Sequence, residues 1–344
     1  MNSQNPKTLF IGRYVSAQCW YRCALPAIQM ENADWIGLHP IEEEFSETYL
    51  GALLGGSVSE YPKFTEYDMI VIQQPRGEPL RKWIEDIQSK GVKVVYENDD
   101  FLHGIWKIPD HQYKASYSKK HMKEFEICMK QCDAQISSTE FLANEYKKYN
   151  SNQFVCKNYL DTLRYDVGIP EREGITIGWS GGTGHDKAIG PWLQVIFEVM
   201  ARNPEMSFIS TGMNYAAALE EHLPGRTKFI PWTPVECYPY MLTNFDIVIC
   251  PSHDSKYFKS KSDLRWLEAS AVGIPTISEP PTYKDSAHTV SVNSVKEFEE
   301  ELEDAIYDRD IYKEMGNDAK AYVQEHRDIS VGIKDWELVQ KSIL

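Results

Sequence analysis

The chain has 344 residues, of which 42% are hydrophobic, and a formal net charge of −15 at pH 7. This length exceeds one ordinary core and predicts two domains of similar size. The acidic balance argues against a general nucleic-acid binder, because the phosphate backbone rewards an excess of Lys and Arg. No apolar run approaches the length of a membrane span and no signal pattern is recognisable, so we expect a cytoplasmic protein.

Strand-like runs alternate with helical patterns in the first half of the chain. Strands are expected over Thr8–Ile11, Met69–Gln73, Val92–Tyr96, Ala134–Ser137 and Phe154–Cys156. Helical periodicity is clearest over Pro79–Ser89, Lys119–Gln131 and Phe141–Tyr149. This alternation predicts a parallel sheet covered by helices on both faces.

The second half repeats the alternation. Strands are expected over Ile175–Ile177, Ser207–Thr211, Lys228–Ile230, Ile247–Cys250 and Thr276–Ser278, and helices over Trp192–Ala201, Ser262–Val272 and Val295–Tyr307. Two such sets predict two doubly wound α/β domains, over residues 1–165 and 166–328, with a linker near Asn158–Glu173. We expect a last helix, within residues 329–344, to cross back to the first domain.

The segment around Lys261 carries the sharpest chemical signal. If Ser262 caps the helix that follows, Lys261 precedes that helix and Arg265 lies in its first turn. The helix macrodipole favours acidic residues there, so this charge order indicates an anion site, and a phosphate is the natural occupant. Glu268 falls on the same helix face and can accept two ribose hydroxyls. A solvated charged helix face is the alternative interpretation.

A glycine-rich loop, ITIGWSGGTGHDKAIG over residues 175–190, allows three interpretations. Ser180 fits the G-x-S-x-G elbow of an α/β hydrolase, with Asp246 and His288 in the right chain order. A dinucleotide-binding turn is weaker, because no third glycine stands at Lys187. The third interpretation is half of a diphosphate cradle, formed by Gly181, Gly182, His185 and Lys187.

The block Lys261-Ser-Asp-Leu-Arg-Trp-Leu-Glu-Ala-Ser-Ala-Val-Gly-Ile-Pro275 resembles the retaining GT-B glycosyltransferases of the large family-4 type. Further matches lie in order at Tyr21-Arg22 with Pro26, Tyr96–Leu102, Asp133–Thr139 with Lys157-Asn158, Phe229–Pro234 and Phe245–Pro251. The resemblance implies two Rossmann-like domains facing across a cleft. It also implies transfer of a sugar from a nucleoside diphosphate, such as a UDP-sugar, to a hydroxyl acceptor, with retention and without a divalent metal. The enzyme would be a hexosyl- or pentosyltransferase.

Site roles follow from the resemblance. Donor-binding residues would be Gly181, Gly182, His185, Lys187, Trp232, Ser262, Arg265 and Glu268. Lys261 and Arg265 would stabilise the leaving diphosphate, and His103 is a further candidate for catalysis or acceptor contact, with an ordinary structural histidine as the alternative. Tyr21, Arg22, Asp99 and Asp100 would lie on the acceptor side. Two positions depart from the family pattern, with Ser260 and Ala188 standing where acidic residues are common.

The acceptor stays open between two classes. One is a glycan or other small hydroxyl compound. The other is a hydroxymethylated base in DNA, as for a phage-type enzyme in the host cytoplasm. The stretch Lys107–Lys123 favours the second, because it holds five lysines, two histidines and two tyrosines against a single aspartate. An exposed basic helix face is its ordinary explanation.

Three further alternatives concern other classes of protein or site. Asp99 and Asp100 follow a strand, as do the metal-binding carboxylates of GT-A glycosyltransferases, although paired acids also cap turns. A non-catalytic nucleotide-sugar sensor would keep the donor site and lack turnover. Trp232, which could border the nucleotide base, is as well explained as a buried structural tryptophan.

Overall fold

A computed structural model describes residues 5–12, 16–37, 63–108, 111 and 114–344. Part of the stretch Lys107–Lys123 singled out in the sequence, at 109–110 and 112–113, lies outside the described residues. The chain divides into two compact units. Unit 1 comprises the described residues up to 108 together with 114–159 and 329–344, and unit 2 is formed by residue 111 and residues 160–328.

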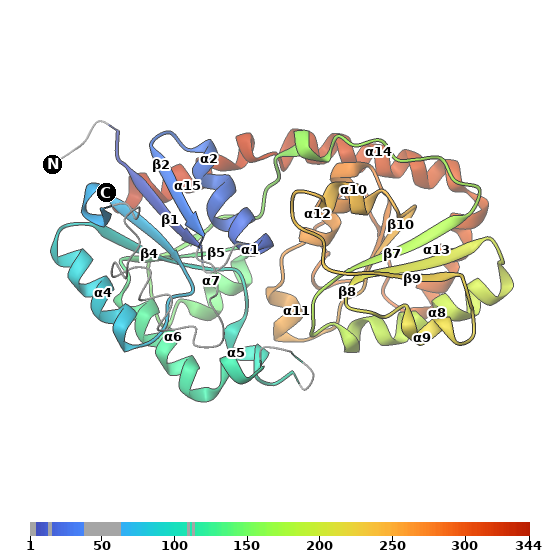
Figure 1. Cartoon of the computed structure of the whole chain (residues 1–344), viewed down its shortest axis with the longest axis horizontal. Helices are drawn as coiled ribbons and strands as arrows, with labels where there is room; N and C mark the ends of the chain where they lie inside the picture. Colours follow the sequence, from blue (N-terminus) through green and yellow to red (C-terminus); the bar gives the residue numbers. More distant parts are fainter. Residues whose placement is uncertain (1–4, 13–15, 38–62, 109–110, 112–113) are drawn as a thin grey trace. The chain divides into compact units, whose positions relative to one another are not determined.

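Unit 1 contains a parallel six-stranded sheet in the order β2-β1-β3-β4-β5-β6. Its strands are β1 (Thr8–Gly12), β2 (Ala33–Gly37), β3 (Met69–Gln73), β4 (Lys93–Asn98), β5 (Ala134–Ser137) and β6 (Gln153–Val155). Its helices are α1 (Ala17–Cys19), the π-helix η1 (Trp20–Ala24), α2 (Leu25–Gln29), η2 (Phe64–Glu66), α4 (Glu78–Ser89), α5 (Leu102–Ile105), η3 (Lys114–Tyr117), α6 (Lys119–Gln131), α7 (Glu140–Tyr146) and α15 (Ile329–Ile343). Figure 1 shows their positions around the sheet.

Unit 2 contains a second parallel sheet in the order β12-β11-β10-β7-β8-β9. Its strands are β7 (Ile175–Gly181), β8 (Met206–Gly212), β9 (Thr227–Ile230), β10 (Ile247–Cys250), β11 (Thr276–Ser278) and β12 (Val290–Ser291). Its helices are η4 (Thr162–Tyr165), α8 (Asp186–Arg202), α9 (Ala217–Glu220), α10 (Tyr238–Leu242), α11 (Lys256–Ser260), α12 (Leu264–Val272), α13 (Val295–Tyr307) and α14 (Arg309–His326). Counted within the unit, this is the strand order of the dinucleotide-binding Rossmann fold.

All ten strands expected from the sequence are present. The observed start of each strand differs from the expected start by at most one residue, and the observed end differs by at most four. The sequence did not predict β2 and β12, because β2 is a half-exposed edge strand of mixed polarity and β12 has two residues. None of the described helices combines the length and the apolar composition of a transmembrane segment.

Two helix starts differ from the prediction. Helix α8 begins at Asp186 instead of Trp192, because Pro191 lies inside the helix, in its second turn, and does not end it. Helix α12 begins at Leu264, so the expectation that Ser262 caps it is wrong. Asp263 occupies the N-cap position without making a capping hydrogen bond.

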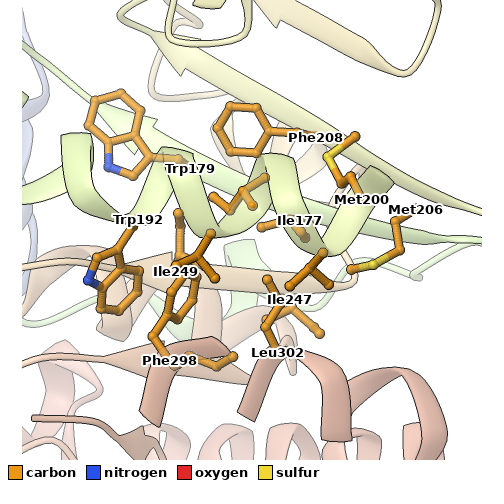
Figure 2. Packing of buried hydrophobic residues seen from close by; sticks show 14 of the residues in the cluster. Ile177, Trp179, Trp192, Met200, Met206, Phe208, Ile247, Ile249, Phe298 and Leu302 are labelled. Carbon is orange, nitrogen blue, oxygen red and sulfur yellow. The ribbon is translucent and has the colours of Figure 1, made fainter. Parts of the chain in front are cut away.

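A core of large apolar side chains supports the sheet of unit 2 (Figure 2). Trp192 of α8 stacks on Phe298 of α13, with ring centroids 3.8 Å apart. Both rings lie beside Ile249 of β10 in the same cluster, which also includes Trp179 of β7. Because these buried aromatic residues tie the helices to the central strands, the loops after β7 and β10 start from a rigid base.

The C-terminal helix α15 packs against the sheet of unit 1. Trp336 meets Phe10 of β1 edge to face, with centroids 5.6 Å apart. Gln340 donates a hydrogen bond from Nε2 to Thr8 Oγ1 at 2.8 Å. The last segment of the chain therefore completes the core of the unit in which the chain begins.

Candidate functional site

The strand order of unit 2 reverses between β7 and β10, which are neighbours in the sheet. In open parallel sheets, ligands bind beyond the carboxyl ends of the strands at such a reversal. The loop after β7 contains Gly181 and Gly182, and the segment after β10 leads through α11 to α12. The topology therefore brings both halves of the predicted donor site to one edge of the sheet.

Arg265 lies at this edge, in the first turn of α12, and is only 9% exposed. Its Nε donates to the carbonyl oxygen of Ser180 at 2.6 Å, and its Nη1 donates to the Tyr283 hydroxyl at 3.1 Å. Among the described residues, no carboxylate forms an ion pair with it. A buried guanidinium held by neutral acceptors keeps its charge for an anion.

Glycine is required where Arg265 meets the loop. A Cβ atom on Gly181 would lie 2.7 Å from Arg265 Nη2. At the end of β8, Gly212 has φ +82, and a Cβ there would lie 2.3 Å from the carbonyl oxygen of Gly181. The ends of β7 and β8 and the guanidinium of Arg265 therefore lie so close together that a side chain on Gly181 or Gly212 would collide with its neighbour.

Two polar ring atoms beside the loop are buried without a partner among the described residues, Trp179 Nε1 and His185 Nδ1. His185 occupies the N-cap position of α8, and its ring meets Trp179 and Phe258 edge to face. Burial, together with the positive charges of Arg265 and Lys261, holds the pKa of His185 well below its ordinary value. The imidazole is therefore neutral at pH 7 and suits hydrogen bonding more than charge pairing.

The other predicted donor-binding residues lie around the same edge. Trp232 is 65% exposed, and its ring lies 3.5 Å from the position of a Cβ on Gly182, so it is not a buried structural tryptophan. Glu268 is buried on α12. Lys261 and Ser262 precede α12, with Lys261 Nζ lying 4.6 Å from the centre of the Tyr257 ring. Lys187 is exposed in the first turn of α8.

Tyr238 and Tyr283 were not among the predicted site residues. Tyr238 donates a hydrogen bond to Ser180 Oγ at 2.7 Å. Burial and the nearby Glu268 carboxylate raise its pKa well above the ordinary value, so the hydroxyl stays protonated. Neither tyrosine lies in a motif, and only the fold brings them to Ser180 and Arg265.

The hydrolase alternative is wrong. Asp246 precedes β10 and accepts a hydrogen bond from the backbone N–H of Thr176, near the start of β7. Ser180 lies on β7 four residues after Thr176, near the carboxyl end of the strand. Four residues of a strand span about 13 Å, so Asp246 and Ser180 lie toward opposite ends of β7. The Ser180 side chain is bonded to Tyr238 instead of a histidine, so no catalytic triad forms.

In unit 1, Arg22 of the π-helix η1 is fully buried. Its Nε donates to Glu97 Oε1 at 2.7 Å, and its Nη1 donates to the Cys156 carbonyl oxygen and to Asn158 Oδ1. Tyr21, on the same helix, is also buried. The observed contacts of Arg22 are internal and join η1 to β4 and to the segment after β6, and its acceptor role stays a prediction.

The predicted acidic turn lies at the carboxyl end of β4. Gln18 Nε2 lies 3.2 Å from both Asp99 Oδ1 and Asp100 Oδ2, and Gln74 Nε2 lies 3.4 Å from Asp99 Oδ1. Gln74, directly after β3, has φ +47, a conformation that costs a non-glycine residue energy and is concentrated at functional sites. Gln18 and Gln74 were not predicted. The described residues contain no group of three acidic, His or Cys side chains able to hold a metal ion.

His103 belongs to a small polar cluster on α5 and its neighbours. Its Nε2 lies 2.9 Å from Glu126 Oε1, and the Tyr149 hydroxyl donates to the same oxygen at 2.9 Å. Tyr149 also stacks on the imidazole, with centroids 5.5 Å apart. Hydrogen bonds to His103 and Tyr149 lower the pKa of Glu126 against the opposing effect of burial. The structure accounts for the orientation of His103 through these contacts, and its catalytic role stays a prediction.

Comparison with known proteins concerns the fold. No protein-family model and no curated protein sequence matches the chain. The structure is similar to that of HepE from Anabaena in complex with UDP and glucose, with a TM-score of 0.66 and 12% identity over 99% of this chain and 100% of that one. It is similar to sucrose-phosphate synthase from Thermosynechococcus elongatus, with a TM-score of 0.69 and 10% identity over 98% and 99% of the two chains.

A glycosyltransferase from Rickettsia africae gives a TM-score of 0.65 with 12% identity over 99% of each chain. The matches span both units, so the whole chain has the fold of these proteins. The GT-B fold expected from the sequence, with two Rossmann-like α/β units, is therefore confirmed. Identity this low says nothing by itself about activity, which depends on the site.

Proposed function

We propose that the protein is a glycosyltransferase that moves a sugar from a nucleoside diphosphate to a hydroxyl acceptor. Unit 2 binds the donor and unit 1 binds the acceptor. The observation that carries the proposal is Arg265, a buried guanidinium at the strand reversal of unit 2 that donates to two neutral oxygen atoms and lies over the Trp179 ring. The GT-B fold, shared with HepE in its complex with UDP and glucose, supports a UDP-sugar as donor.

The chemistry requires stabilising negative charge on the diphosphate as it leaves the sugar. Arg265 supplies a fixed positive charge whose orientation Ser180 and Tyr283 set, so little reorganisation is needed during the reaction. Lys261, the Ser262 hydroxyl and the backbone N–H groups of Gly181 and Gly182 are further donors for the phosphates. Glu268 would accept hydrogen bonds from the ribose hydroxyls. Retention of the anomeric configuration is expected from the family resemblance.

Two rings complete the proposed donor site. Trp232, exposed beside Gly182 and Gly212, offers an aromatic face to the nucleotide base. His185, neutral and with Nδ1 buried and unbonded within the described part of the chain, would hydrogen-bond a phosphate or sugar oxygen. A buried polar atom that lacks a partner costs about 1–3 kcal/mol, so a bound oxygen there would recover much of that free energy.

The acceptor hydroxyl would approach the carboxyl edge of the unit 1 sheet. Gln18, Gln74, Asp99 and Asp100 gather there, and Gln74 has a strained backbone. Amides and carboxylates suit a polyhydroxylated acceptor. A glycan or small hydroxyl compound and a hydroxymethylated base in DNA are the two acceptor classes that we carry forward.

A thermal-shift screen of nucleotide sugars, with and without chelator, tests the donor. We expect one nucleotide sugar to raise Tm, and equally so in the presence of chelator. The assignment of the site is tested by Arg265→Ala, which should lower donor turnover by about a hundredfold or more, as loss of one oxyanion-stabilising group does. Arg202→Ala, which removes an exposed arginine of unit 2, is the matched control.

Wild-type turnover by Arg265→Ala would rule out this site. Donor binding without hydrolysis or transfer to any acceptor would instead favour the non-catalytic sensor.

A further inference from the structure

Glu279, the residue directly after β11, carries a carboxylate that the proposed reaction has not yet used. The side chain is half-buried. Its Oε2 accepts a hydrogen bond from the backbone N–H of Ser252 at 3.0 Å, and within the described part of the chain it has neither another hydrogen bond nor a cationic partner. Because burial disfavours a charge that has no counter-charge, this carboxylate needs an explanation.

Glu279 lies at the same edge of the sheet as the proposed donor site. Ser278 of β11 pairs with Cys250 of β10, and the Glu279 backbone N–H donates to the Cys250 carbonyl oxygen at 3.1 Å. Ser252 follows the end of β10, so a carboxylate bonded to its N–H lies beyond the carboxyl ends of the strands. Ligands of open parallel sheets bind on this side.

The segment that begins with Glu279 also orients Arg265. Tyr283, four residues later, accepts the hydrogen bond from Arg265 Nη1 at 3.1 Å. Between them, the hydroxyl of Thr282 lies 2.9 Å from that of Ser252, which ties the segment to the loop after β10. One short segment therefore holds a carboxylate and helps to hold a guanidinium at the same edge, and the two groups are not paired with each other.

The strand order sets the sequence of groups along this edge. Trp232 lies beside Gly212, the last residue of β8. Arg265 donates to Ser180, near the end of β7. Glu279 follows β11, which is separated from β7 by β10 alone, so the ends of β7 and β11 are about 10 Å apart. With the base at Trp232 and the diphosphate at Arg265, the sugar end of the donor would extend toward β11.

The charge of Glu279 is not required for its bond to Ser252. A backbone N–H needs only an acceptor, which the neutral amide of a glutamine also supplies. Burial raises the pKa of the carboxyl group, against the opposing effect of the Ser252 hydrogen bond. A carboxylate repels phosphate oxygens and accepts hydrogen bonds from hydroxyl groups. In a nucleotide sugar, the groups that match it at this place are the hydroxyls of the sugar.

We propose that Glu279 accepts hydrogen bonds from hydroxyl groups of the donor sugar and thereby selects a neutral sugar over an anionic one. The inference rests on the proposed donor site of unit 2 and adds the specificity of that site. Oε2 stays bonded to Ser252, and Oε1 receives the sugar hydroxyl. Glu279 is a specificity-determining residue, because it contacts the sugar and takes no part in stabilising the leaving diphosphate.

The experiment titrates the full chain with UDP, UDP-glucose, UDP-N-acetylglucosamine and UDP-glucuronic acid by isothermal titration calorimetry. The test variant is Glu279→Gln, which keeps an acceptor for the Ser252 N–H and removes the charge. The matched control is Glu300→Gln, which neutralises an exposed carboxylate of α13 that is paired with Lys296. Thermal melting of each protein without ligand is measured alongside.

We expect wild type to bind one of the neutral UDP-sugars more tightly than it binds UDP or UDP-glucuronic acid. Glu279→Gln should bind that neutral sugar about tenfold more weakly, bind UDP as wild type does, and discriminate less against UDP-glucuronic acid. Its Tm without ligand should equal or exceed that of wild type, because the charge that burial opposes is gone. The control should keep wild-type values throughout.

Unchanged binding of the neutral sugar by Glu279→Gln would overturn the proposal, and a lower Tm with unchanged binding would assign Glu279 a structural role only. Weaker binding of UDP itself by Glu279→Gln would also overturn it, because the residue would then act on the nucleotide. Arg265→Ala, by contrast, should weaken the binding of UDP and of the UDP-sugars alike. A wild-type protein that binds none of the four nucleotides would contradict the donor site and, with it, the role of Glu279.

Discussion

At the scale of residues, three arginines of low exposure show how the partner decides the role. Arg22 is paired with Glu97, and Arg327 is paired with Asp263 through two contacts of 2.8 and 2.9 Å. Among the described residues, Arg265 donates its hydrogen bonds to a carbonyl oxygen and a hydroxyl oxygen, both uncharged. The first two arginines are neutralised within the fold, whereas the third keeps a charge that can act on a ligand.

The pair of Arg22 and Glu97 should be a structural requirement of unit 1. Glu97→Ala leaves a fully buried guanidinium without its carboxylate, and we expect it to reduce the free energy of unfolding by about 3–5 kcal/mol. Urea-induced unfolding followed by circular dichroism measures the effect. Glu78→Ala, which breaks an exposed pair with Arg81, should leave stability almost unchanged. Equal effects of the two substitutions would contradict the role of the buried pair.

His185 should make the stability of the protein depend on pH. Its folded-state pKa lies below the ordinary value of 6.5, so protonation favours the unfolded chain and stability is lost as pH falls below about 6.5. We expect the wild-type Tm to fall more steeply than that of His185→Gln between about pH 7.5 and 5.5. His326→Gln, which changes a more exposed histidine of unit 2, should follow the wild-type curve. Parallel curves for His185→Gln and wild type would contradict the neutral, buried imidazole.

At the scale of elements, the loop after β7 is built around the approach of Arg265 from α12. Gly181→Ala would place a Cβ 2.7 Å from Arg265 Nη2 and displace the guanidinium, whereas a Cβ on Gly182 would meet Trp232 at an ordinary 3.5 Å. We expect Gly181→Ala to lower donor turnover by about a hundredfold and Gly182→Ala to lower it far less. Initial rates of nucleotide-sugar turnover measure both. A reversed order of the two variants would mean that the loop contacts the donor in another way.

At the scale of the whole molecule, the two units differ in how the chain builds them. All helices and strands of unit 2 come from the segment 160–328, to which residue 111 is added, whereas unit 1 requires α15 from the C-terminal end. We therefore expect a fragment of residues 160–328 to fold alone and to bind the nucleotide-sugar donor. A fragment of residues 1–159 should fold poorly because it lacks Trp336, which packs on Phe10, and Gln340, which bonds Thr8. Circular dichroism and thermal melting of both fragments provide the test.

Joining residues 329–344 to the first fragment through a flexible linker should restore cooperative melting. A stable fragment of residues 1–159 without that addition would show that α15 is dispensable for unit 1. The same melting experiments on fragments that end at residue 165 in place of residue 159 test the domain boundary expected from the sequence.

The alternation of strand and helix patterns was sufficient to predict the α/β class and the ten strands, because apolar periodicity is a local property of the sequence. The GT-B fold was expected from the family resemblance of the block Lys261–Pro275. The sequence also made Arg265 a candidate for anion binding, since cations at a helix start oppose the macrodipole and the order of charges is visible in the chain. The start of α12 and the role of Ser180 required the structure. The start of α12 depends on tertiary contacts such as the ion pair of Arg327 with Asp263. A triad of Ser180, Asp246 and His288 would require the three residues to lie at the same edge of the sheet, whereas Asp246 lies near the start of β7.

The sequence by itself therefore determined the class of fold and the positive charge of the proposed donor site, through patterns between residues close in the chain. Only the tertiary structure decided which partners those charges have. Ser180 and Arg265 are 85 residues apart, and Arg22 and Glu97 are 75 residues apart, so no local pattern records either contact.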